Sequence, residues 1–333
     1  MTTDDQPNLE PIEPSRAQEL YLKHKASQCS EVTVQSHEYR LNHFVEWCAR
    51  NDIDNMNEIS GRDLHEFRLW RKNEGDLSKV SMQTQMSTLR VFLKWCGSIE
   101  AVGPDLYNKV LVPEVSGDEE QRDLMLESDR ADEILDHLSK YQYASREHIL
   151  FALLWETGMR IGAARSLDLS DVYVEEECLE LEHRPEAETT LKNGQGGERL
   201  VAISTDLAEL FEDYIEDTRI DATDEYGRKP LLSGNQGRYA RSTIRRIVYT
   251  LTAPCYLGKD CPDCKEGSSS KCPEAVNPHA IRRGSITHYL TNDVPVEIVG
   301  DRMDVSRKVL DKHYDRRSEE VKLEQRRSYL DNI

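Results

Sequence analysis

Apolar residues recur at three- and four-residue intervals through the first hundred residues, which is the pattern of amphipathic helices. Short polar stretches separate these segments, and Ser60 stands three residues before Asp63, as in a capping box. The predicted helices are residues 15–26, about 33–51, a segment that follows Ser60, and about 78–96. Residues 15–112 are therefore predicted to form an all-helical domain, preceded by a polar, proline-containing arm over residues 1–14.

The pattern changes after a stretch at residues 113–121 that contains a proline, a glycine and an acidic run, and that we interpret as a linker. Beyond it, helical periodicity is interrupted by three short alternating runs at 172–174, 178–182 and 199–203, which predict a small antiparallel sheet. Further helices are predicted at 205–220, 242–251, 278–290 and 294–299, and from 305 to the end. We expect a mainly α chain with a small antiparallel β-sheet (α+β), in which residues 122–333 form a second domain ending in a tail helix.

Composition limits the class of protein. The apolar share is 38%, no apolar run approaches the 18 residues of a membrane span, and the amino-terminal residues lack the basic and apolar parts of a signal peptide. These features predict a globular, cytoplasmic protein that does not enter a membrane. The net charge is −19, but residues 221–333 carry +3, so the last third is the basic end of an acidic chain.

The 43 basic residues comprise 28 arginines and 15 lysines, set among 62 acidic residues. This composition is similar to that of proteins from salt-loving cells. In molar salt the Debye length falls to about 3 Å, so the net negative charge would not repel a polyanion at a distance. The alternative is an ordinary acidic cytosolic protein whose charge keeps it in solution.

Three basic segments and one tyrosine, far apart in sequence, are candidates for chemistry. Arg160 follows the helix-breaking Gly158, and Lys192 lies in a glycine-rich turn between two predicted strands. His279 and Arg282 are three residues apart at a helix start, where Asn277 and Pro278 suit the N-cap and the first helical position. Their side chains would share one face beside a helix N-terminus, which favours an anion. Tyr314 lies on a later helix.

In this order the motifs resemble those of the tyrosine recombinases, or phage integrases, and the chain looks Xer-like over nearly its whole length. The resemblance implies a helical core-binding domain that clamps DNA and a mixed catalytic domain. It implies Arg160, Lys192, His279 and Arg282 as the cations around the phosphate and Tyr314 as nucleophile. It further implies double-stranded DNA as partner, a homotetramer on paired sites, and no cofactor for the chemistry.

One family position departs from the pattern. The family usually has a glycine and a histidine, or a tryptophan in place of that histidine, before the nucleophile. Here Arg302 stands near that position, with Asp301 as the other register. An arginine can also donate to the phosphate, so Arg302 is expected among the catalytic residues. Tyr289 and Tyr329 compete with Tyr314 as tyrosines. Two other functions stay open: a type IB-like topoisomerase, and a catalytically inactive DNA-binding regulator of the same fold.

A row of arginines predicts a face that contacts DNA phosphates. Arg238, Arg241 and Arg245 are spaced i, i+3 and i+7, with Arg246 adjoining, on a predicted helix whose opposite positions are apolar. Arg283 adds to the same basic region. The alternative is a solvated amphipathic face.

Four of the eight cysteines lie close together before the His279 motif, in the spacing C-x5-C-x2-C-x7-C. Four thiolates can close a tetrahedral structural zinc site, so this loop is a candidate metal centre. The alternative is a set of reduced thiols. The candidate ligands are Cys255, Cys261, Cys264 and Cys272.

Overall fold

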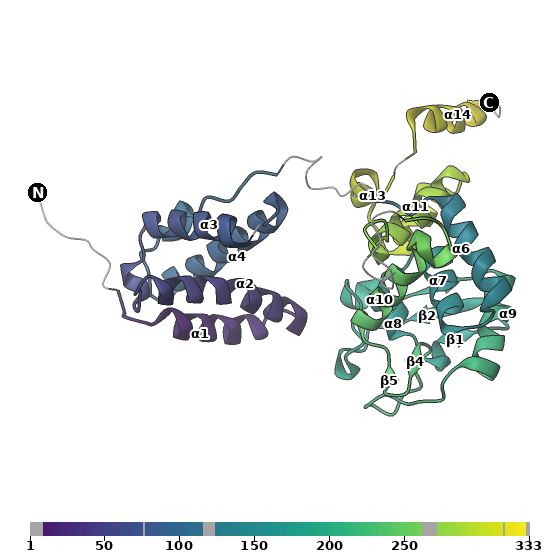
Figure 1. The fold of residues 1–333 in the computed structure, drawn as a ribbon, viewed down its shortest axis with the longest axis horizontal. Helices are drawn as coiled ribbons and strands as arrows, with labels where there is room; N and C mark the ends of the chain where they lie inside the picture. The colour runs from purple at the N-terminus through teal and green to yellow at the C-terminus, as the bar shows by residue number, and fades with distance from the viewer. Residues whose placement is uncertain (1–8, 76, 116–123, 262–271, 316, 331–333) are drawn as a thin grey trace, which may run out of the picture. The chain divides into compact units, whose positions relative to one another are not determined.

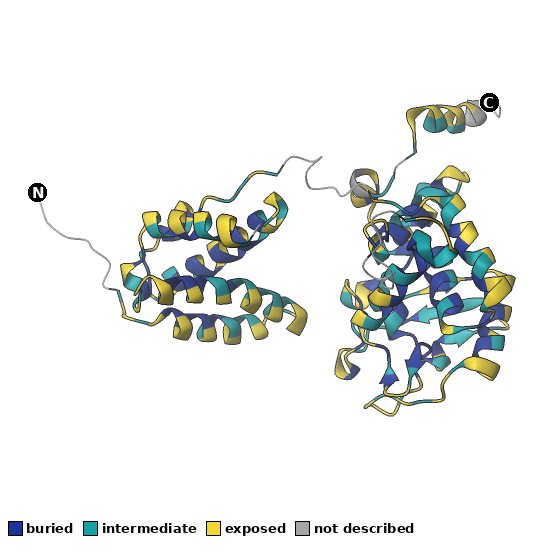
Figure 2. Ribbon diagram, in the orientation of Figure 1, coloured by how far each residue is buried: buried dark blue, intermediate teal, exposed yellow. Residues whose placement is uncertain are grey.

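The computed structural model of the protein describes residues 9–75, 77–115, 124–261, 272–315 and 317–330 (Figure 1). The chain divides into two compact units, Met1–Arg122 and Asp123–Ile333. This division falls next to the linker predicted at 113–121, of which residues 116–121 lie outside the described part. Each unit has its own apolar core, and Figure 2 shows buried positions concentrated on the inward faces of its helices.

The first unit is helical, as the periodicity predicts. Its helices are α1 (Pro14–Ala26), α2 (Glu31–Arg50), α3 (Gly61–Gly75) and α4 (Lys79–Ser98), with the short turns η1 (Met56–Glu58) and η2 (Leu106–Lys109). The predicted capping box is present at the start of α3. The backbone N–H of Ser60 donates to the Asp63 carboxylate over 2.7 Å, and the Asp63 N–H donates to the Ser60 hydroxyl over 3.4 Å.

Aromatic rings form the centre of this first core. Tyr21 of α1 meets Phe92 of α4 edge to face, with ring centroids 5.2 Å apart. Phe44 of α2 meets Phe67 of α3 in the same way at 5.3 Å. All four side chains are fully buried, so each helix contributes one ring to a shared contact and fixes the four-helix arrangement.

The second unit is also mainly helical and contains two small antiparallel sheets. Its helices are α6 (Ser128–Tyr141), α7 (Arg146–Thr157), α8 (Ile161–Ser166), α9 (Thr205–Asp213), α10 (Arg241–Leu251), α11 (Pro278–Thr291), α12 (Val296–Met303), α13 (Arg307–His313) and α14 (Glu319–Leu330). The strands are β1 (Val172–Tyr173), β2 (Cys178–Leu181), β3 (Arg199–Ala202), β4 (Ser233–Gly234) and β5 (Gly237–Arg238). Short helical turns are η3 (Leu169–Asp171), η4 (Pro185–Ala187), η5 (Gly194–Gly197), η6 (Tyr214–Thr218) and η7 (Pro254–Leu257). The predicted fold class is confirmed.

Helix α7 runs through the middle of this unit and packs against α6, α8, α9, α10 and α11. Its apolar residues are buried on every side, which explains why it reads as a nearly continuous hydrophobic segment. The sheet has the order β1–β2–β3, and Leu179 of β2 pairs with Val201 of β3. Both side chains are buried against the same core, so the sheet is attached to α7 through one apolar face.

Several elements differ from the sequence expectation. The helix expected from residue 305 to the end is two separate helices, α13 and α14. The helix predicted over 205–220 is α9 followed by one π-helical turn over Tyr214–Thr218. The β4–β5 hairpin was not predicted, because two-residue strands carry no alternation that a pattern can reveal. In the described residues, no helix is both long and apolar enough to cross a membrane.

Candidate active site

A left-handed glycine sets the direction of the chain that carries Arg160. Helix α7 ends at Gly158, whose φ is +58°, and a Cβ atom there would lie 2.6 Å from the Met303 sulfur. Both the backbone angle and the limited space favour glycine. The chain turns there, and Arg160 becomes the N-cap residue of α8. Its side chain is 20% exposed, so it can still meet a ligand.

Helix α11 positions His279 and Arg282. The predicted cap is confirmed: the Asn277 side chain accepts a hydrogen bond from the backbone N–H of Ala280, and Pro278 occupies the first turn. Arg282 is 1% exposed, and its guanidinium donates to the carbonyls of Gly158 and Met303, both over 2.7 Å. Burial, and then the charge of Arg160, lower the pKa of Arg282 to about 10, so it stays charged at neutral pH.

Burial and nearby positive charges lower the pKa of His279. The residue keeps an exposed face, yet desolvation by the surrounding protein lowers its pKa, and four positive charges lower it further. These charges are, in order of effect, Arg282, Arg160, Lys192 and Arg283. His279 is therefore neutral at pH 7. Lys192 itself is exposed in the turn that leads from β2 to β3.

Tyr314 lies against Arg282. The tyrosine is the C-cap residue of α13, and its backbone carbonyl accepts a hydrogen bond from the Thr287 hydroxyl of α11 over 2.9 Å. The Arg282 Cζ lies 5.4 Å from the centre of the Tyr314 ring. The structure thus brings Arg160, Lys192, His279, Arg282 and Tyr314 to one region of the second unit.

Arg302 is a different case, and its proposed place beside the phosphate needs correction. Its guanidinium donates to the carbonyl of Ala202 over 2.5 Å and to that of Glu156 over 3.3 Å. It also lies over the ring of Tyr289, 5.4 Å from the ring centre. These contacts attach α12 to β3 and α7, so the side chain serves packing between elements.

The residue that reaches the site from this segment is Asp304, in neither of the two registers considered from sequence. Its carboxylate accepts hydrogen bonds from Arg160 and from Asn193, each over 2.6 Å. Asp304 has a left-handed backbone, with φ at +51°. Arg199, at the start of β3, also lies close, because the charges of Asp304 and Arg160 both act on its pKa, which burial lowers.

Arg238 does not belong to the predicted arginine face, because its side chain is buried. It belongs to strand β5, and the helix begins at Arg241. Its guanidinium binds the carboxylates of Asp168 and Asp224, the latter over 2.9 Å, and its side chain is 4% exposed. The positive φ of Gly237, +89°, breaks the helical spacing that the sequence suggested.

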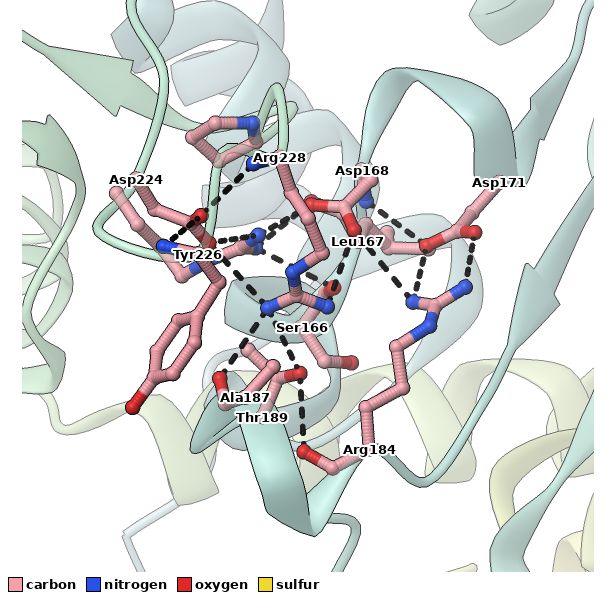
Figure 3. A network of polar contacts seen from close by, with 12 residues as sticks. Ser166, Leu167, Asp168, Asp171, Arg184, Ala187, Thr189, Asp224, Tyr226 and Arg228 are labelled. Atoms are coloured by element: carbon pink, nitrogen blue, oxygen red, sulfur yellow. Dashed lines mark hydrogen bonds and ion pairs between the residues drawn. The ribbon is translucent and has the colours of Figure 1, made fainter.

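Arg238 is part of a buried ionic network through its pairs with Asp168 and Asp224. In Figure 3, Arg184 and Arg228 point toward the carboxylates of three aspartates, two from η3 and its cap and one, Asp224, from a later loop. Arg184 binds Asp171 with two hydrogen bonds, of 2.6 and 2.9 Å, and Arg228 pairs with Asp168 over 3.2 Å and with Asp224 over 3.3 Å. The network joins η3, η4 and the β4–β5 hairpin.

The remaining arginines of that prediction stay candidates for DNA contact. Arg245 and Arg246 are exposed on α10, and Arg241 is half-buried on the same helix. Arg283 is half-buried on α11 and donates to the carbonyl of Leu124 over 3.0 Å.

The cysteine loop is described only in part. The Cys261 and Cys272 sulfurs lie 3.3 Å apart, and Cys255 packs against the same small cluster. Cys264 lies outside the described residues. Within the described ranges, no group of three or more histidine, cysteine or acidic side chains is placed to hold a metal ion.

Comparison with known proteins identifies the family. The model of the phage integrase family matches residues 125–320, and that of the phage integrase N-terminal SAM-like domain matches residues 19–97. The chain belongs to the phage integrase family. It is thus a member of the tyrosine site-specific recombinases.

Individual relatives of this integrase are distant. It is 22% identical to the tyrosine recombinase XerD of Oceanobacillus iheyensis, over 82% of this chain and 84% of XerD. It is 23% identical to a probable integrase/recombinase of Methanocaldococcus jannaschii, over 81% of this chain and 76% of that protein.

Two solved structures share the fold. A lambda integrase dimer bound to a COC′ core site matches with a TM-score of 0.66 and 14% identity, covering 92% of this chain and 78% of that one. The Tn1549 transposon integrase bound to transposon right end DNA matches with a TM-score of 0.67 and 13% identity, covering 97% and 99%.

Proposed function

We propose that the protein is a site-specific DNA recombinase that cleaves and rejoins DNA through a covalent bond between Tyr314 and a 3′ phosphate. In the cleavage step the tyrosine oxygen attacks the phosphorus, a new P–O bond forms, and the bond to the 5′ oxygen breaks. The neutral His279 accepts the phenol proton, and Lys192 gives a proton to the departing 5′ oxygen. A second strand's 5′ hydroxyl then reverses these steps and releases the tyrosine.

The arginines have an electrostatic role in this scheme. A phosphodiester resists attack because its own negative charge repels nucleophiles. Fixed cations that bind the phosphoryl oxygens more tightly in the transition state lower that barrier. Arg160 and Arg282 are suited to this role because acceptors of the protein hold the position of each guanidinium group.

The observation that carries this proposal is the meeting of a tyrosine with cations from three separate segments. Arg160 comes from the α7–α8 junction, Lys192 from the turn before β3, and His279 and Arg282 from α11. Tyr314 joins them from the end of α13, with its ring over Arg282. The DNA-bound integrases that share this fold support duplex DNA as the substrate.

A suicide-substrate assay tests the nucleophile. DNA sites selected from a random library by binding to the Tyr314→Phe variant are nicked near the cleavage position, so that a cleaved strand diffuses away and the adduct accumulates. The assay is run at high KCl because of the acidic composition. Wild type and Tyr289→Phe should form an adduct that survives a denaturing gel, and Tyr314→Phe should form none.

No adduct with wild-type protein that binds the same DNA tightly would contradict the proposal and favour a DNA-binding regulator. An adduct that persists in Tyr314→Phe would contradict the choice of nucleophile. Strand exchange between two labelled duplexes separates recombinase from topoisomerase, because a topoisomerase reseals the strand that it cut. We expect four protomers on a paired site, and mass photometry of the complex measures that number.

A further inference from the structure

We propose that Asp304 is a positioning residue that holds the Lys192 turn against Arg160. It would thereby keep the proton donor at a fixed position relative to the phosphate clamp, the pair Arg160 and Arg282. The inference rests on the proposed function. Asp304 lies between α12 and α13, and it contacts two segments of the site that are far apart in sequence.

The contacts of Asp304 differ from those of an ordinary surface ion pair. One carboxylate oxygen accepts from the Arg160 Nη1 and the other from the Asn193 Nδ2, each over 2.6 Å. The Asp304 backbone carbonyl also accepts from Arg160 over 3.2 Å and from Arg282 over 3.4 Å. The carboxylate side chain is only 16% exposed, so solvent screens this pair less than an exposed one.

The local backbone presents these groups. Asp304 ends α12 with φ at +51° and ψ at +61°, a left-handed conformation that aspartate, asparagine and glycine tolerate best. In this conformation the carbonyl and the carboxylate of one residue both accept hydrogen bonds from neighbouring guanidinium groups. Asp304 therefore supplies a negative counter-charge between two arginines, Arg160 and Arg282, that would otherwise repel each other.

The link to Lys192 runs through its neighbour in the chain. Asn193 directly follows Lys192 and is exposed, so the Asp304 bond provides a side-chain anchor for this turn. A general acid works only when it lies within hydrogen-bond reach of the leaving oxygen. Losing the anchor would widen the range of positions that Lys192 samples and slow the step that needs its proton.

The test uses two variants and a substrate that needs no acid. Asp304→Gly removes the carboxylate and keeps the left-handed backbone, and Asn193→Ala removes only the link to the turn. Glu297→Gln, an exposed position on α12, is the matched control for loss of one negative charge. The substrate pair consists of ordinary suicide DNA and the same DNA with sulfur at the bridging 5′ position. A thiolate leaves without a proton because thiol pKa values lie near 8.5.

On ordinary DNA, both variants should form the adduct on the order of 10- to 100-fold more slowly than wild type and the Glu297→Gln control. On the sulfur-substituted DNA, they should recover to within about threefold of wild type, because the proton donor is no longer needed. The Asn193→Ala result is decisive, because that variant keeps the Asp304 contact with Arg160.

Several results would overturn the inference. Variants that cleave ordinary DNA at the wild-type rate would show that the anchor has no function. Equal slowing on both substrates would place the effect of Asp304 on the phosphate clamp and leave the proposed function intact. A wild-type protein that forms no adduct with either DNA would overturn the proposed function, and this inference with it.

Discussion

Replacing Arg238 by methionine should destabilise the second unit, Asp123–Ile333, and leave the affinity for DNA almost unchanged. Arg238 neutralises two buried carboxylates, Asp168 and Asp224, and its Nη1 also donates to the carbonyl of Arg165 over 2.7 Å. Methionine fills similar space but removes the Arg238 charge and its hydrogen bonds from these acceptors. The variant therefore tests the buried network directly against the alternative that Arg238 contacts DNA.

The size of the effect follows from the remaining partners. Removing one member of a buried ion pair costs about 3–5 kcal/mol, because the other charge stays buried. Arg228 still pairs with Asp168 and Asp224 in the variant, so we expect the lower end, about 3 kcal/mol. In a unit of about 210 residues, each kcal/mol shifts the melting temperature by roughly 2–4 °C, which gives a fall of roughly 6–12 °C.

Calorimetry of the full chain at constant KCl measures that shift, and DNA affinity is measured below the lowered melting temperature. Arg245→Met is the matched control, because Arg245 is exposed on α10. We expect the control to change stability by less than about 0.5 kcal/mol and to reduce the salt dependence of DNA binding by about one phosphate contact. An Arg238→Met protein with an unchanged melting temperature and a reduced salt dependence would refute the reasoning.

Three further expectations concern other parts of the second unit. Gly284→Ala should destabilise by about 1–3 kcal/mol through overpacking, because its Cβ would lie 2.0 Å from the Leu126 carbonyl oxygen; calorimetry measures this, and an unchanged melting temperature would contradict it. Burial lowers the pKa of His148, so the folded state disfavours its protonated form. Below about pH 6.5 the unfolded chain binds this proton more readily than the folded chain does. The free energy of unfolding should therefore be highest above that pH and fall as the pH drops below it. Urea unfolding at several pH values, with His148→Phe showing a shallower decline, tests this, and stability that rises on acidification would contradict it. The cysteine spacing predicts one zinc ion per chain, lost in Cys261→Ser; elemental analysis of protein purified without added metal that finds no zinc would exclude the site.

The parts of the site that sequence could predict depend on local rules. Asn277 and Pro278 indicate the start of α11, because capping and proline preferences act within one helical turn. The Lys192 turn could be placed because two runs of alternating residues flank it. For these two features the signal lies within a few residues of the side chain itself. Tyr314 is predicted as the nucleophile from the order of the family's motifs along the chain.

The errors arise where tertiary structure overrides a local pattern. Arg238, Arg241 and Arg245 have helical spacing, but Gly237, with a positive φ, begins strand β5 and removes Arg238 from that helix. The residue that reaches Arg160 from the α12–α13 segment is Asp304, two and three positions beyond the registers considered. Its position depends on where α12 ends, and a helix end is difficult to place to within one or two residues.

Backbone carbonyls explain why the environment of these arginines is hard to read from sequence. Arg282 donates to the carbonyls of Gly158 and Met303, and Arg302 donates to those of Ala202 and Glu156. Any residue type offers a carbonyl, so such partners leave no trace in the pattern of side chains. Asp304 differs, because its contact with Arg160 uses a carboxylate as well as a carbonyl. The carboxylate supplies a charge opposite to that of Arg160, and its bond to Asn193 joins this ion pair to the Lys192 turn.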